Sequence, residues 1–473
     1  MSETQSFAEA GPGSALHVSP PTDVAFVRDT MVAAQAAPAG TTGAVGWLRA
    51  NLFSSPLNVI QTLIALALVV LIVPPLVRFG LIDAVWSGSN REVCATEVQG
   101  GIRANDWSGA CWAYVGAYLD ELTYGDYPRS QRWRVNLTFV LLALALIPLL
   151  VRSFPYKKAG ILFSAVIFPV ASFILLTGGE LDFEGFLPTG FLLDPGAGKF
   201  WFDYLLFTGV VLGVVYAIVS STGGAAAAAA RNVGILLAGI ALVLFACSVD
   251  FGLRHVRSEL WGGLLVTLVI AVSGIAASLP LGILLALARR SNMPLIKLLS
   301  VAFIEFWRGV PLVTVLFMSS VMLPLFASEG VSIDKLLRAL IGVALFASAY
   351  MAETIRGGLQ AIPKGQYEGA QAVGLTYWQS MRLIILPQAL TIVIPGIVNI
   401  FIGLFKDTTL VLIIGLFDFL GKIQQTFSDP TWATPVQSKT AYLFAAICYF
   451  LFCFGMSRYS IYMERRLDTG HKR

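Results

Sequence analysis

The sequence predicts an all-α polytopic membrane protein that crosses the bilayer about ten times. Hydrophobic residues occupy 56% of its 473 positions and charged residues only 13%, which is about half the usual charged share. Apolar runs of about 20 residues, the length that a membrane-spanning helix needs, recur along most of the chain. Lys and Arg form no basic patch interleaved with aromatic residues, so nucleic-acid binding is not expected.

Residues 1–46 are predicted to form a disordered cytoplasmic tail. Ala, Gly, Pro, Ser and Thr dominate this segment, and its large apolar residues are too few to build a core. It also lacks the charged start and apolar run of a signal peptide. The first span, near 57–77, is therefore expected to stay in the chain as an anchor.

Ten apolar segments are candidate spans. They lie near 57–77, 135–151, 160–177, 204–220, 232–249, 261–288, 301–326, 340–359, 391–416 and 441–457. The segment 391–416 is the least regular, because Pro395 and the charged pair Lys406–Asp407 interrupt it. These spans divide the chain after its tail into an N-terminal part (47–258), a C-terminal part (259–463) and a short cytoplasmic tail (464–473).

The distribution of Lys and Arg predicts the topology, since short cytoplasmic loops are enriched in both. Basic residues gather in alternate connections, at Arg152, Lys157, Lys158, Arg231, Arg289, Arg290, Lys297, Lys364, Arg382, Arg458, Arg465 and Arg466. The opposite loops carry Glu180, Asp182, Glu184, Asp194 and Asp203. This arrangement places both termini in the cytoplasm, although Arg254, Arg257, Lys335 and Arg338 fall outside.

The same topology places a long loop, residues 78–134, on the periplasmic side. Cys94 and Cys111 lie in it, either as a disulfide, which an oxidising compartment would favour, or as two free thiols. The loop is also rich in aromatic residues. It forms either a compact cap over the spans or a docking surface for an external partner, and we favour the cap.

The segment Glu368–Pro387 carries the most informative pattern of the chain. Its spacing, E-x-A-x3-G-x9-I-x-L-P, is set by Glu368, Ala370, Gly374, Ile384, Leu386 and Pro387. We expect a helix from about Gln366 to Val373, a sharp turn at Gly374, and a second helix from Tyr377 to Ile385 that Pro387 ends. The candidate anchors are Tyr367, Leu375, Tyr377 and Trp378. A short rigid protrusion of this kind suits a cleft in a partner protein.

This pattern resembles the ATPase-docking loop of bacterial ABC-importer permeases. Further stretches resemble the polar amino acid permeases of such importers: LWGGLLVTL (260–268), EFWRGVPL (305–312), AYMAETIRGGLQAIPKGQYEGA (349–370) and LFKDTTLVLIIG (404–415). The resemblance covers nearly all of 259–463 and departs at Gly369, where the family usually has alanine. In the N-terminal part, PPLVRFGLIDAVW (74–86) and GACWAYV (109–115) are similar to the larger membrane subunit of general L-amino acid uptake systems.

The resemblance implies the type I ABC importer transmembrane fold with extra N-terminal spans. It further implies a permease subunit of the bacterial inner membrane that imports L-amino acids and is not an enzyme. Its implied partners are a dimer of ATPases, which would hold ATP and Mg, a second homologous permease subunit and a periplasmic amino-acid-binding protein. No cofactor or metal is expected in this chain, because GAGKF (196–200) lacks most of a phosphate loop and the three His residues are scattered.

Charged residues within the spans are candidates for lining a transport path or for locking helices together, since facing lipid would be costly. Glu305 and Arg308 share one helical face and could pair, and Glu353 and Arg356 repeat the same spacing. The path candidates are Lys406, Asp407, Thr408, Thr409, Glu305 and Arg308. Glu353 and Arg356 are expected instead to support the docking loop, because they lie near the cytoplasmic end of their span.

An ion-coupled secondary transporter is the alternative function, with the charges within the spans as its coupling site. Such transporters usually carry inverted repeats and bind substrate near the midplane. No internal repeat links the two parts of this chain. The docking-loop pattern is the feature that distinguishes the two functions.

Overall fold

The computed structural model describes residues 43–151, 153–179, 196–221, 226–326 and 333–467. In these residues the regular structure is helical, with isolated β-bridges between some of the connecting segments. The chain divides into two compact units, residues 1–76 and 77–473. Several residues used to predict the topology lie outside the described residues: Arg152, Glu180, Asp182, Glu184 and Asp194.

The described part of the first unit consists of α1 (Gly43–Asn51) and nearly all of α2 (Pro56–Val77). Helix α1 begins within the predicted tail 1–46, so its last residues are helical rather than disordered. Ala, Leu and Arg in this segment favour helix formation. The rest of the predicted tail, 1–42, lies outside the described residues.

Nine helices of the described residues are long and apolar enough to span a membrane. They are Pro56–Ile82, Arg129–Leu150, Lys157–Thr177, Ala197–Ser221, Ala227–Ser248, Gly263–Arg289, Lys335–Ala361, Ile394–Ile414 and Gln437–Leu467. A bent pair, Pro294–Gly309 and Leu312–Phe326, would make a tenth. The predicted all-α polytopic fold is therefore confirmed.

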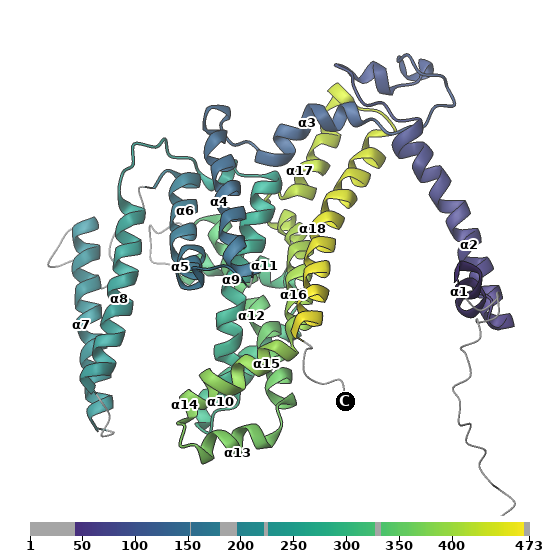
Figure 1. Cartoon of the computed structure of the whole chain (residues 1–473). Coiled ribbons are helices and arrows are strands. Elements are labelled where there is room, and N and C mark those ends of the chain that lie inside the picture. Colours follow the sequence, from purple (N-terminus) through teal and green to yellow (C-terminus); the bar gives the residue numbers. More distant parts are fainter. Residues whose placement is uncertain (1–42, 152, 180–195, 222–225, 327–332, 468–473) are drawn as a thin grey trace, which may run out of the picture. The chain divides into compact units, whose positions relative to one another are not determined.

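The N-terminal part of the second unit begins with the segment that was predicted as a loop. Its helices are α3 (Trp112–Tyr124), α4 (Arg132–Leu150), α5 (Lys157–Leu162), α6 (Phe168–Thr177), α7 (Ala197–Ser221) and α8 (Ala226–Ser248). Helices α4 and α6 lie side by side, and α7 and α8 form a hairpin (Figure 1). Asp203, which we placed in a loop, is instead buried in α7 because that helix begins before the apolar run.

The C-terminal part contains the remaining helices. They are α9 (Gly263–Arg289), α10 (Pro294–Gly309), α11 (Leu312–Phe317), α12 (Lys335–Ala361), α13 (Lys364–Ala372), α14 (Tyr377–Ser380), α15 (Leu386–Ile392), α16 (Ile394–Asp407), α17 (Phe419–Gln425) and α18 (Gln437–Leu467). Helices α9 and α12 pack along one another at its centre. A Cβ on Gly282 would lie 2.5 Å from the Met351 side chain, so glycine permits this close approach.

The predicted span 301–326 is broken into α10 and α11, which meet at 107°. The break falls at Val310 and Pro311, where Val310 adopts an extended backbone. A residue before proline avoids the helical region, because the proline ring would clash with it. One predicted span thus becomes two shorter helices with different directions.

The irregular segment 391–416 also differs from its prediction. Pro395 lies in the first turn of α16 and begins that helix rather than interrupting it, since its missing N–H is not needed there. After Asp407 the chain tightens into a 3₁₀-helix, Thr408–Ile414, which ends at Gly415 in the left-handed conformation. Lys406 and Asp407 therefore lie at the junction between two kinds of helix.

Residues 83–134, called the cap below, form a compact part of the second unit. A disulfide joins Cys94 to Cys111. The buried side chains of α3 share one apolar cluster with residues of α17 and α18, including Phe419, Ile423 and Ala441. The cap and α17 lie at one end of the helix bundle, called the cap end, and α13 and α14 at the other, called the loop end (Figure 1).

Candidate functional site

The 364–387 loop begins with α13, which starts directly after Pro363 and ends at Ala372, two residues before Gly374. Gly374 has a φ of +75°, a conformation that favours glycine because it has no Cβ. Around this turn, the Leu375 N–H donates to the Ala370 carbonyl oxygen at 3.1 Å. The expected helix, turn and position of Gly374 are therefore present, with the helix beginning two residues before the predicted Gln366.

The second helix of the loop starts at a capping box formed by Thr376 and Gln379. It runs from α14 through a π-helical turn, Met381–Ile385, directly into α15. Our prediction that Pro387 ends this helix is wrong. The wider π-turn shifts the backbone pairing just before Pro387, and the proline then occupies the first turn of α15, where it is tolerated.

The pattern residues of the loop have two kinds of environment. Ala370 is buried, and Leu375, Ile384 and Leu386 are half-buried. Ile384 and Leu386 pack in the apolar cluster that also contains buried residues of α12. Glu368, Tyr377 and Pro387 are exposed. The tip adds large apolar side chains that face solvent, with Trp378 68% exposed and Val373 72% exposed. Exposed apolar side chains that lie together are typical of interaction surfaces.

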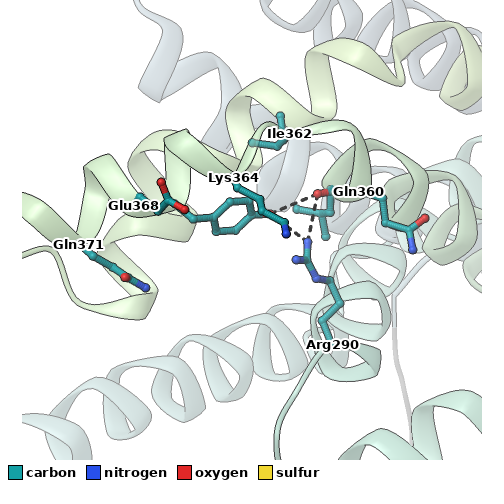
Figure 2. A pocket seen from close by; sticks show the side chains of 8 residues that line it. Arg290, Gln360, Ile362, Lys364, Glu368 and Gln371 are labelled. Carbon is teal, nitrogen blue, oxygen red and sulfur yellow. Dashed lines mark hydrogen bonds between the residues drawn. The ribbon is translucent and has the colours of Figure 1, made fainter. Parts of the chain in front are cut away.

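The base of the loop is held by Arg290, which follows the last residue of α9. Its guanidinium Nη1 donates to the Leu359 carbonyl oxygen at 3.1 Å and to the Tyr367 hydroxyl at 2.9 Å. The same guanidinium lies 5.5 Å above the Tyr367 ring. Figure 2 shows Arg290 pointing into a cleft of about 450 Å³ lined also by Gln360, Ile362, Lys364, Glu368 and Gln371. Helices α9, α12 and α13 are thereby tied at one point.

A charged network lies next to this base and joins α9, α10 and α12. Glu353 is its hub, with one oxygen 3.2 Å from Arg289 Nη1 and the other 2.9 Å from Arg356 Nε. Arg308 Nη1 lies 4.0 Å from Glu353, and Arg289 Nη2 also pairs with Glu305 at 3.0 Å. We refer to these five residues as the Arg–Glu network.

The network matches one predicted pair and replaces the other. Glu353 and Arg356 pair as their spacing suggested. Glu305 turns instead to Arg289 on α9, and among the described residues no ion pair joins it to Arg308. The sequence alone marks Arg289 only as a sign of topology, because nothing local shows that α9 ends beside α10.

The other path candidates lie along the α16 junction. The Thr408 hydroxyl donates to the Phe405 carbonyl oxygen at 2.8 Å. The Thr409 hydroxyl donates to the Lys406 carbonyl oxygen at 2.9 Å. Both hydroxyls therefore support the change from α-helix to 3₁₀-helix. Lys406 is exposed and Asp407 half-buried. Glu305 and Arg308 do not join this group, because their contacts connect them to the Arg–Glu network.

The cap end holds two buried charged residues, Asp418 and Lys422, that were not predicted from the sequence. Asp418 is fully buried and caps α17, accepting from the Gly421 N–H at 2.9 Å and the Tyr449 hydroxyl at 3.1 Å. Burial raises the pKa of its carboxyl. Lys422 is buried as well. An Asp before a short apolar helix is a recognisable capping signal, whereas Lys422 reads as an ordinary loop lysine. Within the described residues, no group of His, Cys, Asp and Glu could hold a metal ion.

Residues 278–469 match the family described as "Binding-protein-dependent transport system inner membrane component". The chain is 43% identical over 427 residues to the inner membrane amino-acid ABC transporter permease protein YhdY of Escherichia coli, covering 90% of this chain and 94% of the relative. It is 41% identical over 464 residues to the glutamate/glutamine/aspartate/asparagine transport system permease protein BztC of Rhodobacter capsulatus. This match covers 95% of this chain and 100% of the relative.

A solved structure titled "Crystal structure of an amino acid ABC transporter with histidines" is 31% identical and covers 43% of this chain and 92% of its own, with a TM-score of 0.39. The two curated relatives extend over the N-terminal spans as well as the family region. Both are transport permease components. The chain belongs to the family of amino-acid ABC transporter permeases.

Proposed function

We propose that this chain is the permease subunit of an importer that carries L-amino acids across the inner membrane, driven by a separate ATPase that docks on the 364–387 loop. The exposed apolar tip of that loop, on a rigid base, is the observation that carries the proposal. Large apolar side chains in water are unfavourable unless a partner covers them. The remaining partners are a second permease subunit and a periplasmic amino-acid-binding protein, and ATP and Mg belong to the ATPase.

Movement of the ATPase would reach the spans through the base of the loop. Only Ile362 and Pro363 separate α12 from α13. Arg290 binds Tyr367 on α13 and the Leu359 carbonyl on α12, and its neighbour Arg289 belongs to the Arg–Glu network. A push on α13 therefore acts on α9, α10 and α12 together, which is how packed elements convert a local displacement into a helix movement.

The Arg–Glu network serves this coupling and not the transport path. Glu353 and Arg356 keep the supporting role that the sequence predicted for them. Glu305 and Arg308, predicted as path candidates, join the same network by their ion pairs. Lys406, Asp407, Thr408 and Thr409 remain our candidates for contact with the substrate, because the half-buried charge and the helix break lie together.

The orientation of the chain follows from its two ends. A disulfide such as Cys94–Cys111 persists in an oxidising compartment, which supports a periplasmic cap. The loop end then faces the cytoplasm, where an ATPase has access to ATP. Both termini lie on that side in the topology predicted from Lys and Arg.

The substrate class is that of polar L-amino acids. One relative is named for transport of glutamate, glutamine, aspartate and asparagine, and another is named as an amino-acid ABC transporter permease. The resemblance of the C-terminal part to polar amino acid permeases supports the same class. A panel of labelled amino acids in an uptake assay would define the range.

Reconstitution of the chain with its partner subunits in proteoliposomes tests the proposal. ATP-driven uptake should be lost in Trp378→Asp, because a carboxylate in the apolar tip opposes docking, while membrane insertion stays normal. Tyr156→Asp is the matched control, since Tyr156 is 74% exposed outside this loop. Normal ATP-driven uptake by Trp378→Asp would reject the docking role. Uptake driven by an ion gradient without ATP would favour the ion-coupled transporter instead.

A further inference from the structure

Lys422 is a fully buried cation at the cap end, with only 1% of its side chain exposed. Its Nζ lies 2.8 Å from an Asp126 carboxylate oxygen and 3.7 Å from a Glu121 carboxylate oxygen. It also lies 5.6 Å from the centre of the Phe417 ring. A buried charge is tolerated only with close partners of opposite sign. The position of α17, which carries Lys422, therefore depends on two residues of the cap.

The carboxylates are fixed in place by the way α3 meets α9. Gly263 has a φ of +63°, and a Cβ there would lie 2.1 Å from the Leu122 carbonyl oxygen. A Cβ on Gly125 would lie 2.4 Å from the Gly262 backbone. The end of α3 thus rests directly on the backbone of the first turn of α9. Asp126 follows this contact by one residue, so its carboxylate has a rigid base.

Further contacts join the cap to the segment after α17. The Tyr114 hydroxyl is hydrogen-bonded to the Thr426 hydroxyl, and the Tyr118 hydroxyl donates to Asp429. Trp432 packs in the same apolar cluster as α3. Within the described residues, Lys422 nevertheless forms both of the ion pairs that join α17 to the cap.

Helix α17 is also the continuation of the candidate path segment. The 3₁₀-helix Thr408–Ile414 that follows Lys406 and Asp407 is separated from α17 by only four residues, Gly415 to Asp418. Two hydrogen bonds of 2.9 Å attach this connection and the first residue of α17 to α9. The Gly263 N–H donates to the Phe417 carbonyl oxygen, and the Phe419 N–H donates to the Thr267 hydroxyl. A displacement of the cap would therefore reach the path segment through α17.

The two carboxylates that pair with Lys422 reach the protein surface, but Lys422 does not. The Asp126 side chain is 57% exposed and that of Glu121 is 36% exposed, whereas Lys422 is closed off. Both carboxylates line a surface cleft of about 450 Å³ that also includes Tyr118, Asp120, Arg129 and Arg132. A protein that binds this face therefore acts on the cap beside Asp126 and Glu121, and any movement of the cap is passed to Lys422 through these two carboxylates.

We propose that Lys422 is a positioning residue for transport, which ties α17 and the path segment before it to the cap through Asp126 and Glu121. Docking of the periplasmic binding protein on the cap face is thereby transmitted to the 408–418 segment. This inference rests on the proposed function, because it assumes an importer with a binding protein. Lys422 itself contacts neither partner nor substrate.

The test uses the complete importer in proteoliposomes, with ATPase activity measured in the absence and in the presence of saturating binding protein. Lys422→Met keeps the length of the side chain and removes the charge. Maximal stimulation by the binding protein should fall by about tenfold or more, because loss of one partner of a buried charge pair leaves the other charges unpaired. Basal ATPase activity and the binding-protein concentration for half-maximal stimulation should stay unchanged. Lys422→Arg, which keeps the charge, should restore most of the stimulation.

Asp126→Asn provides a second variant should Lys422→Met fail to insert, because Asp126 is half exposed and Glu121 remains near Lys422. Like Lys422→Met, Asp126→Asn should lower the maximal stimulation by the binding protein. A purely structural role would lower the amount of complex but not the stimulation per complex. Stimulation per complex equal to the wild type in both Lys422→Met and Asp126→Asn overturns the inference. Absence of ATP-driven uptake by the wild-type complex would instead reject the proposed function.

Discussion

The two ends of the helix bundle differ in how closely they are packed, and two glycines show the difference. Gly374 at the loop end and Gly263 at the cap end both have left-handed backbones. No atom lies within 4 Å of a Cβ added to Gly374, whereas one added to Gly263 would lie 2.1 Å from a carbonyl oxygen. The loop end is open, as the proposed surface for a partner must be. The cap end is closed, so the cap is part of the folded body.

The charges at the two ends follow the same division. The Arg–Glu network is partly exposed, and its hub Glu353 shares several arginines. At the cap end Lys422 is buried and Asp418 is fully enclosed. A shared, hydrated network can exchange partners at low cost, whereas a buried pair fixes a geometry. We therefore expect the loop end to change its contacts during transport and the cap end to keep them.

The largest effect should come from Gly263→Ala. The new Cβ meets the Leu122 carbonyl oxygen, and a left-handed backbone disfavours alanine. Overpacking and backbone strain together should cost about 2–5 kcal/mol. We expect loss of folded protein or a large fall in the thermal unfolding midpoint in detergent, measured by size-exclusion chromatography after heating. An unchanged midpoint would contradict the closed packing of the cap end.

Removal of the disulfide should be the next largest effect. The bond between Cys94 and Cys111 spans 17 residues, and closing a loop of that size stabilises by about 3 kcal/mol. In a variant with both cysteines changed to alanine, hydrogen exchange should speed up in residues 88–105, whereas α3 keeps its protection because it packs on α9 and α17. Equal loss of protection in α3 would show that the disulfide, and not the packing, holds the cap.

Glu353→Gln should have a moderate effect that is larger on coupling than on stability. The substitution removes the negative charge that Arg289 and Arg356 share, and a charge-assisted hydrogen bond contributes about 1.5–3 kcal/mol. We expect reduced uptake at unchanged basal ATPase activity in proteoliposomes.

Glu305→Gln is the matched control for Glu353→Gln, because Glu305 is 53% exposed and has Arg289 as its ion-pair partner. An exposed pair contributes no more than about 1 kcal/mol, so this variant should transport nearly as well as the wild type. An equal loss of uptake in the two variants would show that Glu353 is not the central residue of the Arg–Glu network.

Features that depend on the membrane or on local sequence could be predicted from the sequence. The spans follow from the length of apolar runs, since lipid leaves few alternatives to a helix. The turn at Gly374 follows from one residue type in one local pattern. The route of the chain after Pro387 could not be predicted, because proline ends a helix in most settings and only the preceding π-turn accommodates it here.

Contacts between distant residues could not be predicted. Glu305 lies three residues from Arg308, yet it pairs with Arg289 because α10 packs against α9. Lys422 and Asp126 are nearly 300 positions apart, and nothing in the sequence near either one indicates the other. The pattern of the 364–387 loop could therefore be recognised in the sequence. The contacts that would transmit a movement of this loop to the spans could be identified only from the fold.

The smallest effects concern two glycines of the loop itself, and they should have opposite signs. Gly369 lies inside α13 with no atom within 4 Å of an added Cβ, so Gly369→Ala should stabilise this helix by about 1 kcal/mol. Gly374 is equally open but left-handed, so Gly374→Ala should destabilise the turn by about 1–2 kcal/mol. Hydrogen exchange of α13 should slow in the first variant and speed up in the second.

These two variants separate the stiffness of the loop from its packing, because neither changes a contact. If a rigid lever is what transmits the ATPase movement, uptake per ATP hydrolysed should rise or hold in Gly369→Ala and fall in Gly374→Ala. Gly374→Asn is the control, since asparagine tolerates the left-handed conformation better than alanine does, and it should lie between the wild type and Gly374→Ala. The same uptake per ATP in all three would mean that the loop end works through its contacts alone, and the contrast with the rigid cap end would then be sharper than we propose.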